Sequence, residues 1–352
     1  MLYQTANPHG GDLYSHSVKL DFSANTNPFG TPKSVRRAVI ESVDLLNQYP
    51  DPYCRELVAA LADFERVPQE FILCGCGAAE LIFSFCTAVK PGKALELAPT
   101  FSEYSSALEA VGCEVVRYSL NKENGFALTE NFPEFLQDSD CDVLFLCNPN
   151  NPTGQIVEPM LLDKIAQVCH ERGIRLFLDE CFLDLSDQGR DLSLKNKLRE
   201  YPGLFLLKAF TKSYGMAGLR LGYCLSADQA LLTAMGCSTQ PWNVSLPAQK
   251  AGVAALKEVE FLRQTRLEIQ TQRKWLEEQF AALGFCVCPA QANYLLLYHH
   301  LPVYERLLER GILVRNCSNY HGLEQGWFRV AVRGERENRV LMDTVRSILE
   351  EA

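Results

Sequence analysis

Five short apolar runs recur in the middle of the chain, and helical patterns separate most of them. The runs cover residues 94–98, 142–147, 174–178, 204–209 and 221–225. Residues 160–172 lie between two of these runs, and their apolar side chains fall on one face of a helix: Leu161, Leu162, Ile165 and Val168. This alternation of strands and helices predicts an α/β fold, in which helices cover both faces of a mainly parallel sheet.

The remaining patterns divide the 352 residues into three parts. A large domain is expected over residues 48–252, and a long helix at 261–280 leaves it. A smaller α+β domain is expected over residues 253–352, with these elements: strands near 293–298 and 327–332 and a closing helix at 335–349. Residues 1–47 are expected to form an N-terminal arm that packs with the small domain. The active site is then expected between the domains.

Composition argues against several classes of function. The net charge is −9, from 43 acidic and 34 basic side chains, and this argues against nucleic-acid binding. No apolar run approaches the length needed to span a membrane, and no signal for secretion is visible, so no membrane partner is expected. The 14 cysteines show no zinc-finger spacing, which predicts no metal and a reducing, cytoplasmic setting.

Among the residues of the chain, Lys212 is the strongest indication of function. It follows the apolar run at 204–209, so its amine is expected at the end of a buried strand. Desolvation lowers the pKa of a lysine, and the neutral amine can attack a carbonyl. Arg220, eight residues later, can supply a fixed charge for a phosphate. A carbonyl compound with a phosphate suggests pyridoxal 5′-phosphate as the cofactor, whereas an isolated lysine more often lies on a solvated surface.

Three other segments favour the same cofactor. Asp179 ends the run at 174–178, where it can keep a pyridinium nitrogen protonated or simply cap the next element. Asn151 follows another run and can donate to a phenolate oxygen or belong to an ordinary Asn-Pro turn. A third segment opens a predicted helix whose free N–H groups could hold phosphate, although its glycine could also serve a turn: Cys76, Gly77 and Ala78.

In their order along nearly the whole chain, these segments resemble the fold-type I pyridoxal-phosphate enzymes, the aspartate-aminotransferase superfamily. The resemblance implies that Lys212, Asp179, Asn151 and Arg220 bind the cofactor. It also implies that Phe101 stacks on the pyridine ring.

Three positions in this resemblance depart from the common pattern or involve a second subunit. Phe182 stands where a tyrosine often bonds the phenolic oxygen, which leaves more of that task to Asn151. Ala209 stands where many relatives carry a phosphate-binding serine, so Thr211 is expected to take a larger share. Tyr49 matches a tyrosine that reaches the partner subunit's cofactor, which implies a homodimer with the active site at the interface. Tyr49 and Lys212 are the candidates for reprotonating the substrate Cα.

A narrower resemblance concerns the two ends of the chain. Residues 20–30 are similar to the start of histidinol-phosphate aminotransferases, while the His-Gly-Gly sequence in 7–12 and the segments 311–320 and 327–333 are similar to threonine-phosphate decarboxylases of cobalamin biosynthesis. This implies decarboxylation of O-phospho-L-threonine to (R)-1-amino-2-propanol O-2-phosphate and CO₂.

Three alternatives stay open for the function. The first is O-phospho-L-serine decarboxylation, because one methyl group changes binding by only about 1–3 kcal/mol. The second is a histidinol-phosphate or aromatic aminotransferase with the same cofactor site. The third, a cofactor-binding regulator, would need a DNA-binding module that the chain does not show.

The substrate residues are expected on the arm and in the small domain. Arg329 matches the position that clamps the substrate carboxylate across the superfamily, although a strand arginine can also form a surface ion pair of little value. His9, Asn25, Arg315 and Arg333 are the candidates for the substrate phosphate and for orientation, and His9 could equally be a turn residue. A bond at Cα breaks when it is perpendicular to the cofactor ring, so these contacts are expected to select the reaction.

Overall fold

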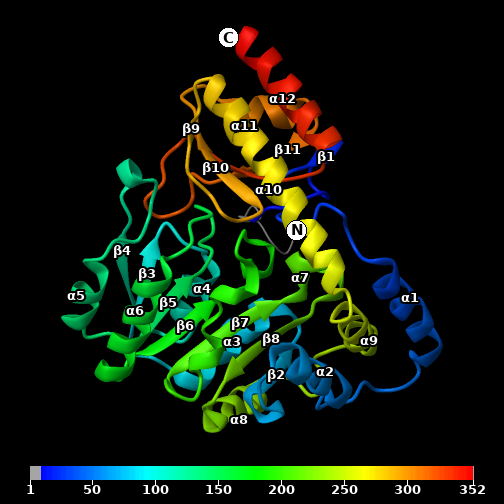
Figure 1. Ribbon diagram of the computed structural model, residues 1–352, viewed down its shortest axis with the longest axis vertical. Coiled ribbons are helices and arrows are strands. Elements are labelled where there is room, and N and C mark those ends of the chain that lie inside the picture. Colours follow the sequence, from blue (N-terminus) through cyan, green and yellow to red (C-terminus); the bar gives the residue numbers. More distant parts are fainter. Residues whose placement is uncertain (1–8, 352) are drawn as a thin grey trace.

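The computed structural model describes residues 9–351 (Figure 1). The first eight residues of the predicted arm, including Asn7 and Pro8 of the opening motif, lie outside this range, as does residue 352. A seven-stranded sheet forms the larger part, in the order β2-β8-β7-β6-β5-β3-β4. Its strands are β2 (Ile72–Gly75), β3 (Lys93–Ala98), β4 (Glu114–Ser119), β5 (Val143–Cys147), β6 (Arg175–Asp179), β7 (Leu204–Ala209) and β8 (Gly222–Ser226).

All five predicted runs are strands, within a residue or two of the expected ends. β8 differs in direction, because it runs antiparallel to both of its neighbours. A parallel pair requires a crossover, but the chain between β7 and β8 turns back at the same edge and pairs Ala209 with Gly222. The edge strands β2 and β4 were not predicted from the sequence. β2 is short, and β4 mixes polar and half-buried residues, so neither forms an apolar run.

Helices cover both faces of this sheet because its side chains alternate in direction. On β5, Leu144 and Leu146 join one hydrophobic cluster, while Phe145 and Cys147 join the other. The first cluster is covered by α2 (Arg55–Glu65), α5 (Phe132–Gln137), α6 (Pro159–Arg172) and α9 (Leu246–Ala255). The second is covered by α3 (Gly77–Val89), α4 (Glu103–Ala110) and α8 (Gln229–Ser238). Both faces are therefore buried, as the sequence predicts.

A second, smaller layer lies above the carboxyl ends of the parallel strands, and α10 (Val259–Ala282) runs up to it from the large sheet (Figure 1). Its antiparallel sheet has the order β12-β13-β10-β9, with these bounds: β9 (Cys286–Val287), β10 (Tyr294–Tyr298), β12 (Arg315–Asn316) and β13 (Trp327–Ala331). Two further helices complete it, α11 (Val303–Glu309) and α12 (Glu335–Glu350).

The N-terminal arm joins this smaller layer through a short parallel pair. β1 (Leu20–Asp21) pairs with β11 (Ile312–Leu313), and Phe22 packs into the core of the small domain. From there the arm continues to α1 (Lys33–Glu41), which packs on α9 of the large part. The predicted boundary at residue 252 falls inside α9, and the domain limits themselves stay a prediction. None of the helices in residues 9–351 is long and apolar enough to cross a membrane.

Candidate active site

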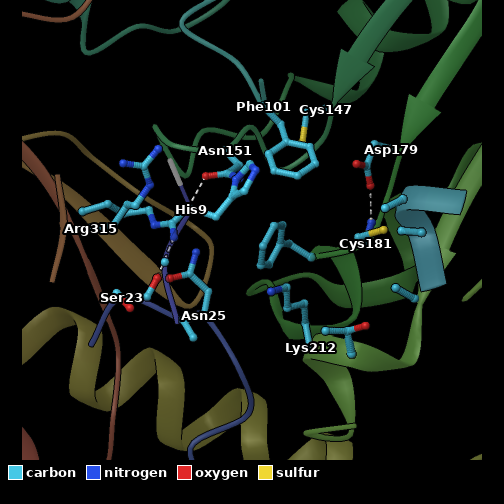
Figure 2. A pocket seen from close by; sticks show the side chains of 18 of the residues that line it. His9, Ser23, Asn25, Phe101, Cys147, Asn151, Asp179, Cys181, Lys212 and Arg315 are labelled. Carbon is cyan, nitrogen blue, oxygen red and sulfur yellow. Dashed lines mark hydrogen bonds between the residues drawn. The ribbon is translucent and has the colours of Figure 1, made fainter. Parts of the chain in front are cut away.

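A cavity of about 230 Å³ lies where the carboxyl ends of β5, β6 and β7 face the small domain. The arm, the large sheet and the small domain all contribute to its wall. Figure 2 shows His9, Asn25 and Arg315 on one side of this cavity and Lys212 and Asp179 on the other. The structure thus brings together twelve residues that the sequence singles out: His9, Asn25, Ala78, Phe101, Asn151, Asp179, Phe182, Thr211, Lys212, Arg220, Arg315 and Arg329.

Lys212 belongs to α7 (Phe210–Ser213), the single turn of helix that follows β7. Burial lowers the pKa of its amine to about 8, and the positive charge of Arg329 adds to the effect. Its Nζ lies 5.6 Å from the centre of the Phe182 ring. The backbone is also held, because the Asn27 amide donates to the Lys212 carbonyl oxygen at 3.0 Å. With a pKa of about 8, roughly a tenth of the amine is neutral at pH 7, far more than in an ordinary lysine, and the neutral form is the nucleophile.

Asp179 is buried at the end of β6, and two groups fix its carboxylate. The Tyr104 hydroxyl donates to Oδ2 at 2.6 Å, and the Cys181 amide donates to Oδ1 at 2.8 Å. Burial raises the pKa of Asp179, while these hydrogen bonds oppose the rise. The carboxylate is therefore oriented by partners on both oxygens. Neither Tyr104 nor Cys181 was predicted from the sequence to have a role in the site.

Asn151 is oriented by Arg329. The guanidinium Nη1 of Arg329 donates to the Asn151 side-chain oxygen, and its Nη2 donates to the Ser23 carbonyl at 2.8 Å. Because the amide oxygen is engaged, the NH₂ group of Asn151 is the end that remains for a ligand in the cavity. This is the donor that a phenolate oxygen requires.

Two arginines lie side by side at the small-domain wall. Arg315 on β12 is paired in register with Arg329 on β13, and the two are only 7% and 6% exposed. Like charges on opposed strand positions repel each other. Within residues 9–351, neither guanidinium forms a salt bridge with a carboxylate; Arg315 instead donates to Asn319 Oδ1 at 2.9 Å. Two buried cations without a carboxylate partner can together bind an anion.

Asn25 lines the same cavity as these arginines, and its buried side chain lacks hydrogen-bond partners among the residues described. Both polar atoms of its side chain are buried and find no hydrogen-bond partner within the described chain, and the same is true of Arg329 Nε. Leaving such a buried group unsatisfied costs about 1–3 kcal/mol, so these atoms are expected to meet a polar ligand. His9 stands nearby, with its Nε2 at 2.9 Å from Glu103 Oε1.

The opposite end of the cavity combines the start of α3 with Arg220, two groups that can bind a phosphate. Gly77 opens α3 with φ +82°, and a Cβ added to it would lie 2.7 Å from Arg220 Nη2. The positive φ favours glycine at this position, and the missing side chain leaves room for the arginine close to the helix start. Ala78, Thr211 and Arg220 line the cavity at this end. Cys76 and Gly77 are not among the lining residues, and the Cys76 amide donates to Glu80 Oε2 at 2.6 Å.

Two other predicted residues lie away from the cavity. Arg333 donates to the Asp21 and Ala24 carbonyl oxygens and to the Thr26 hydroxyl, so it holds the arm in place. A contact between Arg333 and the substrate therefore stays a prediction. Tyr49 is 77% exposed and stacks on Trp242, with ring centres 4.6 Å apart. It does not reach the cavity of its own chain. No cluster that could hold a metal ion occurs in residues 9–351.

Comparison with known proteins defines the class. Residues 17–345 match the family model for aminotransferases of class I and II, and the chain belongs to this family. Among curated relatives, the threonine-phosphate decarboxylase of Salmonella typhimurium is 38% identical over 97% of this chain and 96% of its own length. Histidinol-phosphate aminotransferase 1 of Psychrobacter arcticus is 32% identical over 99% of this chain and 92% of its own.

Solved structures confirm the predicted fold class, that of the fold-type I pyridoxal-phosphate enzymes. The histidinol-phosphate aminotransferase of Clostridium acetobutylicum matches with a TM-score of 0.88 and 26% identity, over 95% of this chain and all of its own (100%). The L-threonine-O-3-phosphate decarboxylase of Porphyromonas gingivalis matches with a TM-score of 0.83 and 22% identity, over 94% and 99% of the two chains. The histidinol-phosphate aminotransferase of Sinorhizobium meliloti, solved with pyridoxal-5′-phosphate, matches with a TM-score of 0.85 and 21% identity, over 96% of this chain and 93% of its own.

Proposed function

We propose that this chain decarboxylates O-phospho-L-threonine to (R)-1-amino-2-propanol O-2-phosphate and CO₂, a reaction of cobalamin biosynthesis. The observation that carries the proposal is the pair of buried arginines, Arg315 and Arg329, which face the same cavity as Lys212. A phosphorylated amino acid brings two anions, a carboxylate and a phosphate, and two cations without carboxylate partners suit it. The 38% identity to a threonine-phosphate decarboxylase supports the same substrate.

Pyridoxal 5′-phosphate is the cofactor, and the cavity fits it at each end. The close approach of Arg220 to Gly77, whose φ of +82° favours glycine, suits a phosphate at the start of α3. The amine of Lys212, with its pKa lowered to about 8, suits the carbonyl carbon. Asp179 would face the ring nitrogen, Asn151 the phenolate oxygen, and Phe101 a face of the ring.

The residues of the chain decide which bond of the substrate breaks. When bound, the cofactor withdraws electrons from Cα. Arg329 binds the carboxylate, and Arg315 with His9 and Asn25 binds the phosphate, so the substrate is held at two points. This fixes the rotation about Cα and sets the bond to the carboxylate perpendicular to the ring. After CO₂ leaves, Lys212 or the partner's Tyr49 delivers a proton to Cα.

Production of CO₂ without glutamate is the expected result when the protein is incubated with cofactor, O-phospho-L-threonine and 2-oxoglutarate. Both products are measured in the same tube, because transamination would form glutamate and leave the carboxylate in place. Parallel reactions contain O-phospho-L-serine or histidinol phosphate. If every substrate gives glutamate without CO₂, the protein is an aminotransferase. If CO₂ is released faster from O-phospho-L-serine than from O-phospho-L-threonine, phosphoserine is the preferred substrate.

The proposal includes a homodimer in the cytoplasm. Four apolar side chains close to Tyr49 in the sequence are exposed: Ile40, Val43, Leu46 and Tyr53. Trp242, whose ring contacts Tyr49, is exposed as well. Exposed apolar residues gathered in this way favour a protein interface. A second copy that covers them would bring Tyr49 to the site of its partner. All 14 cysteines are free, which is consistent with a reducing compartment.

Mixing an inactive variant, Lys212→Ala, with an impaired one, Tyr49→Phe, tests the shared active site. Lys212→Ala removes the amine, and Tyr49→Phe removes a hydroxyl without disturbing the core, because Tyr49 is 77% exposed. Random mixing after dissociation should restore about a quarter of the native activity, because half of the dimers then hold one complete site. The activity of the mixture is compared with that of each variant alone. Failure to recover activity in dimers shown to have exchanged subunits would place Tyr49 outside the partner's site.

A further inference from the structure

A cluster of buried charges lies on the face of the sheet opposite to the cavity, and the reaction outlined above does not use it. We call it the charge cluster, and its members are Glu65, Glu180, Asp184, Arg190, Lys195, Lys208 and Tyr223. The side chains of Glu65, Glu180 and Lys208 are at most 3% exposed. Ionised groups are rarely buried this deeply unless they are paired.

Glu65, the last residue of α2, is the centre of the charge cluster. Its Oε1 accepts from the Tyr223 hydroxyl at 2.5 Å. Its Oε2 accepts from Arg190 at 2.7 Å and from Lys195 at 2.9 Å. Burial disfavours the ionised form, yet the neighbouring cations, Lys208 first among them, hold the pKa of Glu65 below its usual value. Glu65 is therefore an anion that four side chains hold in place.

Lys208 on β7 joins this centre to β6. Its Nζ lies 2.9 Å from Glu180 Oε2 and 3.9 Å from Glu65 Oε1. Glu180 also accepts from the Ser193 hydroxyl at 2.7 Å and from the Leu194 amide at 3.1 Å. Burial opposes the charge on Lys208, but Glu180 and Glu65 outweigh it and raise the pKa of the amine. The charge cluster then holds three carboxylates and three cations, and its net charge is zero.

The charge cluster is attached to both of the residues on which the proposed chemistry depends. Glu180 directly follows Asp179, and its amide donates to the Leu207 carbonyl of β7 at 2.9 Å. Asp184 accepts from the Ser213 hydroxyl at 3.3 Å, and Ser213 directly follows Lys212. Arg190 links the two halves, because it pairs with Glu65 and lies 3.7 Å from Asp184. The ends of β6 and β7 are thereby fixed from behind.

The two lysines of this region, Lys208 and Lys212, have pKa values shifted in opposite directions. Lys212 faces the cavity with its pKa lowered to about 8, whereas the pKa of Lys208 is raised. Lys208 precedes Ala209, which lines the cavity, and successive residues of a strand point to opposite faces. Lys208 is therefore held as an ammonium ion away from the cavity, where it cannot act as a nucleophile.

We propose that Lys208 is a positioning residue, whose paired charge fixes the spacing between Asp179 on β6 and Lys212 after β7. The inference rests on the proposed role of Lys212 as the cofactor lysine. A buried ion pair adds little net stability, since the loss of hydration offsets the attraction, so its contribution here is to geometry. A misplacement of about 1 Å in an active site can cost about a hundredfold in rate.

The double variant Lys208→Met/Glu180→Gln tests this inference, because it removes one charge of each sign and leaves Glu65 with Arg190 and Lys195. We expect it to fold and to bind cofactor. A looser turn exposes the Lys212 nitrogen more to water, so the pH midpoint of the visible absorption of the lysine-bound cofactor should rise by about half a pH unit. We expect kcat to fall about tenfold with KM nearly unchanged.

The matched control is Lys93→Met/Asp140→Asn, which removes an exposed pair of 2.9 Å at the amino-terminal end of β3. It should leave the midpoint and kcat at their native values. If the Lys208→Met/Glu180→Gln variant folds and shows the native midpoint and kcat, the charge cluster only stabilises the fold and the inference is overturned.

If that double variant does not fold, Tyr223→Phe tests the inference in its place, because it removes one hydrogen bond to Glu65 and keeps the aromatic ring. A native midpoint in Tyr223→Phe would then overturn the inference, and a raised midpoint would support it. The absorption midpoint requires no substrate. The two proposals can therefore fail separately. If the native protein does not act on O-phospho-L-threonine but the variant shows the raised midpoint, only the proposed substrate is contradicted.

Discussion

Lys212→Ala is expected to lower kcat by about 10⁴-fold, because it removes both the nucleophile and a proton donor for Cα. The cavity is otherwise unchanged, since the backbone at Lys212 is held by the amide of Asn27. The visible absorption of the lysine-bound cofactor should disappear with the activity. Steady-state kinetics and an absorption spectrum of the purified variant measure the two effects.

Lys250→Ala is the control for this variant, because Lys250 is an exposed lysine of α9 that pairs with Glu56 at 2.6 Å. It should keep both the spectrum and the activity, since an exposed ion pair contributes little. Activity of Lys212→Ala within tenfold of the native value would show that another amine carries the chemistry. Lys208 is not that amine in this structure, because its Nζ pairs with Glu180 behind the sheet.

The residues that the sequence predicts for the core of the cofactor site share one property, because each lies near the end of a strand or the start of a helix. Lys212, Asp179 and Asn151 come directly after apolar runs, and the carboxyl ends of neighbouring parallel strands meet at one edge of a sheet. Their convergence was therefore predictable from local patterns. The fold class was predictable for the same reason, because the alternation of strands and helices leaves few arrangements of the sheet.

Contacts between distant segments were not predictable in this way. Tyr104 reaches Asp179 from a helix on another part of the chain, and no pattern of spacing links the two. The charge cluster is similar, because Glu65 meets Lys208 only when α2 packs against the sheet. A sequence shows that a buried carboxylate needs a cation, but it does not show which cation folding brings.

Arg333 and β8 illustrate two further features that the sequence does not predict. Arg329 and Arg333 are four residues apart, so both would face the cavity if the strand continued. β13 ends at Ala331, and Arg333 turns to the carbonyl oxygens of the arm instead. For β8, the apolar run predicts a strand but carries no information on its direction, which the returning connection from β7 sets.

Asp179→Asn is expected to lower kcat by about 10³-fold, because a neutral amide cannot keep the ring nitrogen of the cofactor protonated. The replacement has nearly the same shape, and its remaining oxygen can still accept from Tyr104 or from the Cys181 amide. Folding and cofactor binding should therefore persist while turnover is lost. Thermal unfolding, cofactor content and kcat are measured on the same preparation.

Asp228→Asn is the matched control, since Asp228 caps α8 by accepting from the Leu231 amide at 2.9 Å, a contact that asparagine also makes. It should retain native turnover. Native kcat in Asp179→Asn would mean that the ring nitrogen needs no charged partner, and the electron withdrawal assigned to this site would be wrong. A variant that loses the cofactor as well as kcat would show instead that Asp179 contributes mainly to binding. The expected separation, cofactor retained and turnover lost, follows from a carboxylate that the Tyr104 hydroxyl and the Cys181 amide hold in place.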